Sequence, residues 1–153
     1  MIRRLAARLQ VRLRRRDSGR AIVEFLVVGL LVLVPVVYFL VTLARVQAAA
    51  FAVSTASREA GRAFTTAITE GDAYVRAEAA ARISFEDYDF AADGTVQLSC
   101  DGTPCLRPEG RVETVATVNV RLPLVPDLLS GTIPAVLPVS ATHVATVDRF
   151  RGR

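Results

Sequence analysis

The hydrophobic pattern of the chain begins with one long apolar run. Phe25 to Ala44 is a stretch of twenty consecutive residues without a charged side chain. At about 1.5 Å per residue, a helix of this length spans the roughly 30 Å hydrocarbon core of a bilayer. The run and its polar borders therefore predict a single transmembrane helix over residues 20–45.

Beyond this run, apolar residues recur at helical spacing over residues 46–69. They are Val46, Ala49, Ala50, Val53, Ala56, Ala60, Ala63, Phe64 and Ala67. A stripe three to four residues apart marks one face of a helix that covers a folded core. The transmembrane helix is thus expected to continue, without a break, into a helix that belongs to the following domain.

A second, alanine-rich helix is predicted over about residues 72–84. Glu70 and Gly71 end the first helix, and Asp72 is the expected N-cap of the second. Its shared apolar face is expected to hold Val75, Ala79 and Ile83.

The period then changes to two, which predicts strands over about 95–100, 112–122 and 139–147. The expected inward positions are Val96, Leu98 and Cys100, then Val112, Thr114, Ala116, Val118, Val120 and Leu122, then Val139, Ala141, His143, Ala145 and Val147. Prolines between Leu122 and Pro138 exclude a central strand there and predict an ordered loop. The fold class is therefore α+β: a long amino-terminal transmembrane helix that continues into an exported helix packed on a small antiparallel sheet.

Charge divides the chain into the same parts. Residues 1–45 hold nine arginines against Asp17 and Glu24, a net charge of +7, whereas residues 46–153 hold ten arginines against thirteen acids, a net charge of −3. Eight arginines precede the apolar run, and the positive-inside rule keeps such an end in the cytoplasm. We therefore expect a basic cytoplasmic leader at 1–19 and an exported domain at 46–153.

The basic leader allows more than one role. Ile2, Leu5, Leu9 and Leu13 would share one helical face, so the segment could lie on an anionic inner leaflet. It could also serve only to fix the topology. Binding to nucleic acid is not expected, because the stretch has no interleaved aromatic residues and adjoins a membrane span.

A cleaved signal peptide is the alternative to a retained helix. Val46, Gln47 and Ala48 resemble the small-residue pattern before a signal peptidase cut, which would make Ala49 the first mature residue. The apolar run is longer than the roughly 7 to 15 residues of a signal core, which favours retention.

The cysteines predict a disulfide. Cys100 and Cys105 flank a turn-forming sequence, Asp-Gly-Thr-Pro, on the exported side. A disulfide between them would hold the ends of neighbouring strands together, and two free thiols are the alternative. The distant His143 does not complete a zinc site with one cysteine pair.

No catalytic constellation accompanies these elements. His143, the single histidine, has no nucleophile motif near it, and a structural role is expected. Glu86, Asp87 and Asp89 lack the spacing of a calcium loop and read as a solvated acidic loop. We therefore expect no enzyme activity, no catalytic residue, no metal, no cofactor and no small-molecule substrate.

The segment GRAIVEF, from Gly19 to Phe25, resembles the processing site of type IV pilin-like proteins. Together with the adjoining VEFLVVGLLVLVPVVYFLVTLARVQAAAFAVSTASREAGRA, it resembles the TadE-like family of tight-adherence (Tad, or Flp) pilus assembly proteins. The resemblance is strongest over residues 18–64.

This resemblance implies that a prepilin peptidase cuts between Gly19 and Arg20. Glu24 is then the fifth mature residue, and with Phe25 it would take part in subunit assembly by meeting the terminal ammonium of a neighbouring subunit. The other interpretation places Glu24 at the membrane interface, where it pairs with Arg20 one turn earlier.

The family further implies a minor pilin or pseudopilin of a Tad pilus. Its location would be a bacterial cell membrane or a surface pilus, with a cytoplasmic amino terminus and an extracytoplasmic domain. Its partners would be other pilins, the prepilin peptidase and the Tad assembly platform. The alternative is an uncleaved, single-pass adhesion or scaffold protein.

Overall fold

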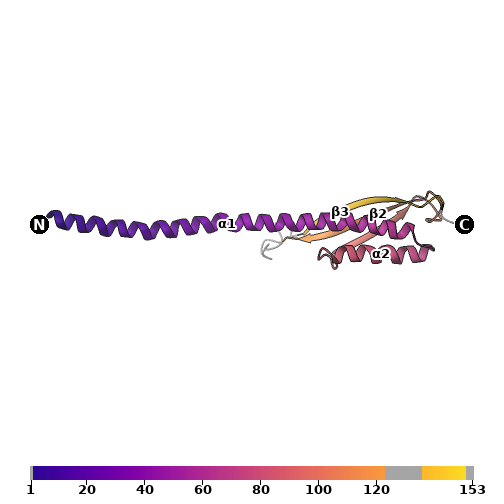
Figure 1. The fold of residues 1–153 in the computed structure, drawn as a ribbon, viewed down its shortest axis with the longest axis horizontal. Helices are drawn as coiled ribbons and strands as arrows, with labels where there is room; N and C mark the ends of the chain where they lie inside the picture. The colour runs from indigo at the N-terminus through magenta and orange to yellow at the C-terminus, as the bar shows by residue number, and fades with distance from the viewer. Residues whose placement is uncertain (1, 123–135, 151–153) are drawn as a thin grey trace. The chain divides into compact units, whose positions relative to one another are not determined.

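The computed structural model describes the backbone of residues 2–122 and 136–150, and the side chains of residues 20–122 and 136–150. The expected α+β class is confirmed: a long apolar amino-terminal helix, a second helix and a small antiparallel sheet (Figure 1). The elements are α1 (Ile2–Thr65), α2 (Glu70–Glu86), β1 (Gly94–Cys100), β2 (Arg111–Arg121) and β3 (Val136–Thr146). The chain divides into two compact units, Met1–Val41 and Thr42–Arg153.

Helix α2 begins two residues before its predicted start. Its N-cap is Thr69, whose hydroxyl accepts a hydrogen bond from the backbone N–H of Asp72 at 3.2 Å. The prediction of Asp72 as the N-cap is therefore wrong. Asp72 instead lies in the first turn with Glu70, where carboxylates interact favourably with the helix dipole, and it pairs with Arg76 at 3.7 Å.

The buried face of α2 also differs from the prediction. Val75 and Ile83 are 68% and 58% exposed. The buried residues are Ala73, Ala77, Ala81, Ser84 and Phe85. Apolar residues lie on both sides of this helix, so periodicity alone could not select the inward side. The alanine side was selected because small side chains let α2 approach α1 and the sheet closely.

The sheet has the order β1-β2-β3, and both pairings are antiparallel. Its predicted inward positions are correct: Val96 is opposite Ala116, which is opposite Ala141, and all three residues are buried or half-buried. The alternation continues along β1, β2 and residues 139–146 of β3, whereas Val136, Leu137 and Pro138 are all exposed. Leu122 lies one residue beyond the end of β2.

Strand β3 begins at Val136, three residues before the predicted start, and therefore includes Pro138. The predicted loop over residues 122–138 is thus wrong at its carboxyl end, and residues 123–135 lie outside the described residues. Proline is tolerated in β3 because this strand forms an edge of the sheet, where one side of the backbone bonds to no strand.

The core of the Thr42–Arg153 unit lies between the helices and one face of the sheet. Figure 1 shows the carboxyl-terminal part of α1 and α2 side by side along the strands. The rings of Phe64 and Tyr74 meet edge to face, with centroids 5.0 Å apart, and link the two helices. Gly61 lies against β2 and β3, because a Cβ added there would be 3.2 Å from the Ala145 side chain and 3.3 Å from that of Thr114.

Candidate functional site

The amino-terminal candidate site lies on a continuous helix. Gly19 and Arg20 both fall within α1, which shows no break at the bond between them. Arg20 and Glu24 are exposed, and Phe25 is 76% exposed. The structure therefore places these residues along about two turns of helix, with the side chains from Arg20 onward exposed.

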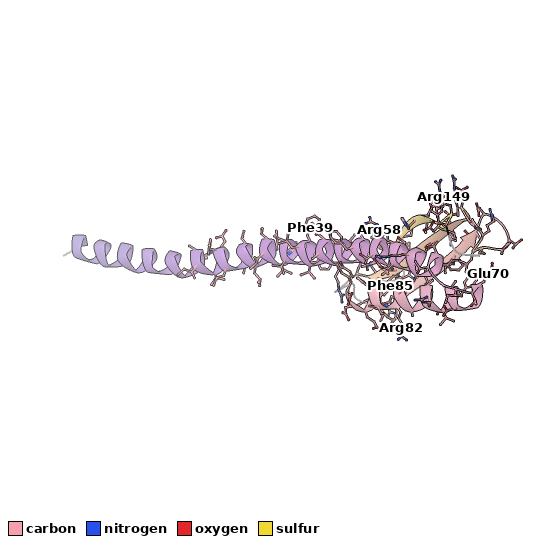
Figure 2. The ribbon with its side chains drawn as sticks, turned by 45° about the vertical axis from the view of Figure 1, so that its right-hand side comes forward. Phe39, Arg58, Glu70, Arg82, Phe85 and Arg149 are labelled. Carbon is pink, nitrogen blue, oxygen red and sulfur yellow. A yellow bond between two sulfur atoms is a disulfide. The ribbon has the colours of Figure 1, made fainter. Side chains whose placement is uncertain are left out.

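The apolar run that follows has no buried residue. Its leucines, valines and phenylalanines are 42% to 76% exposed, as Figure 2 shows for Phe39 at 65%, and Tyr38 is half-buried. This helix is long and apolar enough to cross a membrane, and it is the one candidate span among the described residues. In water, such a continuous exposed surface would be far larger than the few hundred Å² that soluble monomers tolerate.

Glu24 is the single charged residue between Arg20 and Arg45. Arg20 lies one turn earlier on the same helix, but no ion pair joins the two side chains in the described part of the chain. The interfacial pair expected as the second interpretation is thus not formed in this structure. Glu24 presents its carboxylate to whatever surrounds the helix.

Pro35 and Gly29 interrupt the regularity of the run without ending it. Proline has no N–H, so the carbonyl of Leu31 loses its usual helical donor, yet α1 continues through this position. A Cβ added at Gly29 would meet nothing within 4 Å. The open space around Gly29 contrasts with the close packing around Gly61.

The second candidate region is the loop between β1 and β2. A disulfide joins Cys100 and Cys105, whose Cα atoms are 5.5 Å apart. Asp101 pairs with Arg107 at 2.9 Å, and its carboxylate accepts a hydrogen bond from the backbone N–H of Arg111 at 3.0 Å. The turn expected from the sequence is therefore closed by both covalent and polar links.

Residues of α2 anchor this loop, and sequence analysis did not identify them. The Glu70 carboxylate accepts a hydrogen bond from the backbone N–H of Cys105 at 2.5 Å. The Tyr74 hydroxyl lies 4.0 Å from the Cys105 sulfur. These contacts join positions more than thirty residues apart, so no local pattern could have indicated them.

The acidic loop after α2 is exposed and makes a surface ion pair with α1. Asp89 pairs with Arg45 at 3.5 Å, and the Arg45 guanidinium lies 5.7 Å from the centre of the Phe90 ring. Asp87 is the C-cap of α2. The Asp89 side chain is 90% exposed, so the acidic loop is solvated as expected, and its pair with Arg45 is a surface contact between this loop and α1. Both members of the pair are largely exposed, so the ion pair contributes about 1 kcal/mol or less.

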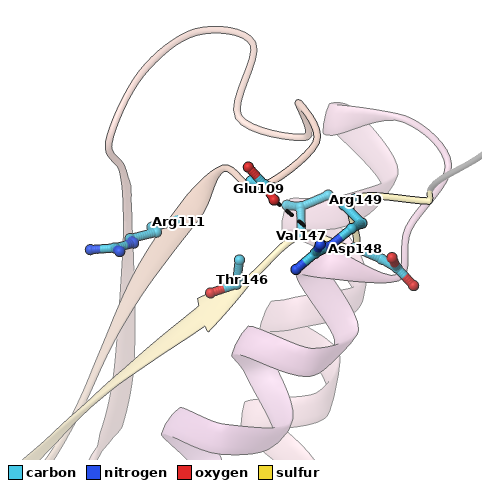
Figure 3. Close-up of a pocket in the computed structure, with 6 residues that line it drawn as sticks. All are labelled: Glu109, Arg111, Thr146, Val147, Asp148 and Arg149. Carbon is cyan, nitrogen blue, oxygen red and sulfur yellow. Dashed lines mark ion pairs between the residues drawn. The ribbon is translucent and has the colours of Figure 1, made fainter.

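An open, polar pocket of about 560 Å³ lies where β3 ends (Figure 3). It is lined by Glu109, Arg111, Thr146, Val147, Asp148 and Arg149. Glu109 and Arg149 pair across it at 3.7 Å, and both are largely exposed. Because acidic and basic side chains both line this solvated pocket, its charge does not favour the binding of an anion or of a cation.

His143 is half-buried on the inner face of β3, where its ring faces Gly61. Within residues 20–122 and 136–150, no group of three or more histidine, cysteine or acidic residues could hold a metal ion.

Comparison with known proteins adds no assignment: no family model, no curated protein and no solved structure matches this chain.

Proposed function

We propose that this chain is a single-pass membrane protein that serves as a minor pilin or pseudopilin of a Tad-type pilus. The observation that carries the proposal is the exposed apolar stretch of α1 from Phe25 to Ala44, which starts at the last residue of the Gly19 to Phe25 motif. A helix of this kind needs lipid or other apolar helices around it. The arginine-rich leader would hold the amino terminus in the cytoplasm and export the sheet domain.

Glu24 is proposed to take part in the assembly of pilin subunits. A carboxylate drawn toward the bilayer centre costs about 2.5 to 3.5 kcal/mol on insertion scales, so it needs a partner. The structure provides none within the described chain. The ammonium group created by cleavage between Gly19 and Arg20, on a neighbouring subunit, would supply the missing charge.

An uncleaved membrane anchor is the second candidate, and the continuity of α1 favours it. A peptidase that binds an extended strand must first unwind the helix around Gly19 and Arg20. If this unwinding does not occur, the chain remains a bitopic adhesion or scaffold protein with its leader attached.

The amino-terminal residue of the mature protein tests both candidates. The full chain would be expressed in its native cells, purified from membranes and analysed by terminal sequencing. Arg20 as the first residue is the result expected for a processed pseudopilin. Met1 would identify the uncleaved anchor, and Ala49 would identify a product released by signal peptidase and refute both candidates. A Gly19→Leu variant is the control, because it should retain Met1 if processing depends on the glycine.

A further inference from the structure

Arg20 and Glu24 carry opposite charges at the amino-terminal start of the apolar run. Both residues are exposed, and neither forms an ion pair with any residue that the structure describes. Beyond Glu24, twenty uncharged residues separate these two charges from the next one, Arg45. Both groups are therefore available to a partner outside the chain.

The order of the two residues disfavours an ion pair within one helix. Side chains four residues apart are neighbours on a helix surface, and the favourable order places the acid before the base. Here the base, Arg20, comes first, so a pair with Glu24 of the same helix gains little. The open arrangement of the two side chains is consistent with this order.

A bilayer around the apolar run increases the need for a partner, a step that rests on the proposed function. Opposite charges attract more strongly at the edge of a hydrocarbon layer than in water, because the surroundings are less polar. Charged side chains in membrane helices are accordingly paired with one another in most cases. A lipid phosphate can pair with Arg20, but the Glu24 carboxylate needs a cation.

A second copy of the chain carries the complementary charges at matching depth. Every copy has the same arginine-rich leader, so all copies insert in the same direction and two neighbouring membrane helices are parallel. Arg20 and Glu24 are four residues apart, about 6 Å along the helix axis. An extended arginine side chain covers a step of this size. Each copy can therefore offer its guanidinium to the carboxylate of the other.

We propose that two copies of this chain associate in the membrane through reciprocal ion pairs, in which the Arg20 guanidinium of each copy binds the Glu24 carboxylate of the other. The planar guanidinium can donate two parallel hydrogen bonds to a carboxylate, whereas an ammonium group acts as a point charge. Arg20 is charged before and after a cut at Gly19. The association therefore does not require the terminal ammonium that processing creates.

These pairs give the proposed pilin a partner before it is processed. Two uncleaved copies meet in the membrane because both charges are already present in the full chain. A cut between Gly19 and Arg20 then adds a second cation, the α-ammonium, to the same residue. The guanidinium of Arg20 holds the second copy, and the new ammonium is free for the carboxylate of a further pilin subunit.

Energy transfer between labelled copies in phospholipid vesicles tests this inference. The full, uncleaved chain is produced in a host without a prepilin peptidase and is reconstituted at a series of protein-to-lipid ratios. The sequence contains no lysine, so an amine-reactive donor or acceptor dye attaches to the terminal amino group alone. Transfer between donor-labelled and acceptor-labelled copies should rise with the ratio and give an association constant.

Charge variants identify the groups that pair. Arg20→Gln and Glu24→Gln should each lower the association constant about tenfold, because each removes both pairs and one polar contact between membrane helices is equivalent to about threefold. Glu59→Gln, an exposed position farther along α1, is the matched control and should leave the constant unchanged. Copies with Arg20→Glu should not associate with one another, nor should copies with Glu24→Arg. A mixture of these two variants should recover the association of the original chain.

Either of two results would overturn the inference: Arg20→Gln associates as strongly as the original chain, or the mixture of Arg20→Glu and Glu24→Arg copies shows no transfer. Terminal sequencing of protein from native cells keeps this test separate from the proposed function. A chain that begins at Arg20 in those cells but shows no charge-dependent transfer would refute the reciprocal pairs and leave the pilin proposal intact. A chain that keeps Met1 but shows such transfer would do the reverse.

Discussion

Helix α1 exposes its largest apolar side chains between residues 20 and 41, whereas between residues 42 and 65 it buries mainly alanine. Leu31 is 70% exposed, but Ala56 and Ala60 are fully buried. The two parts belong to one helix and differ in what surrounds them. Burial in the second part follows from close packing against α2 and the sheet, for which small side chains are an advantage. The exposed apolar side chains of the first part therefore indicate that this part lies in an apolar environment such as a membrane, and not in a protein core.

Charged residues introduced into the first part of α1 should have the largest effect of these changes, because they oppose membrane insertion. Val32→Arg combined with Val36→Arg should raise the cost of membrane insertion by about 5 to 7 kcal/mol. The chain should then be lost from the membrane fraction that resists carbonate extraction. Thr55→Arg combined with Glu59→Arg, on the exposed face of the second part, should remain in that fraction. If both double variants stay equally in the membrane fraction, the first part of α1 is not the segment that lies in the membrane.

Alanine substitutions at two phenylalanines, one in each part of α1, test how much burial contributes to stability. Phe64 is fully buried and Phe25 is 76% exposed. Phe64→Ala should destabilise the domain by about 3 to 5 kcal/mol, because it removes a buried ring and its contact with Tyr74. Phe25→Ala should leave domain stability unchanged. Pulse proteolysis of the full chain in urea measures both, and a shared midpoint would show that the ring of Phe64 is not part of the core.

Substitution of two glycines, one in each part of α1, tests how closely each part is packed. Gly61→Val should destabilise the domain by about 1 to 3 kcal/mol, because its side chain would press on Thr114 and Ala145. Gly29→Val enters open space and should leave the proteolysis midpoint unchanged. Equal midpoints for the two valine variants would mean that α1 does not approach the sheet at Gly61.

The disulfide should stabilise the domain that follows the apolar run, and its formation depends on that domain lying outside the cytoplasm. Replacing both Cys100 and Cys105 by serine should destabilise the domain by about 2 kcal/mol, the value expected for so short a loop. Non-reducing peptide maps of protein from native cells should show the two peptides linked, since bonds of this kind persist outside the cytoplasm. Complete alkylation of both thiols without prior reduction would refute the disulfide in the native protein.

Glu24 should show the smallest effect on insertion. Glu24→Gln and Glu24→Ala remove a charge from the start of the run, so membrane abundance should be unchanged or slightly higher. Cross-linking to other pilins and the number of surface fibres should nevertheless fall, because a neighbouring ammonium would lose its partner. Wild-type fibres with both variants would favour the static anchor over the assembly role.

Local patterns in the sequence predicted most of the fold. The uncharged run from Phe25 to Ala44 predicted a membrane-length helix, and alternation predicted the inner face of every strand, because each property repeats within one element. The pairing of Cys100 with Cys105 was indicated by a turn of four residues. The motif from Gly19 to Phe25 indicated the type of function from the sequence, and the structure adds that its described side chains, from Arg20 to Phe25, are exposed and form no ion pair with each other.

Tertiary packing decided what no local pattern contains. Both sides of α2 are apolar, and close approach to α1 selected the alanine side over Val75 and Ile83. Thr69 and Asp72 are both capping residues, and the end of α1 at Thr65 left Thr69 in position to accept the Asp72 amide. Pro138 could join a strand because β3 forms an edge. Each outcome depends on neighbours that are distant in sequence, whereas periodicity and capping preference describe one segment at a time.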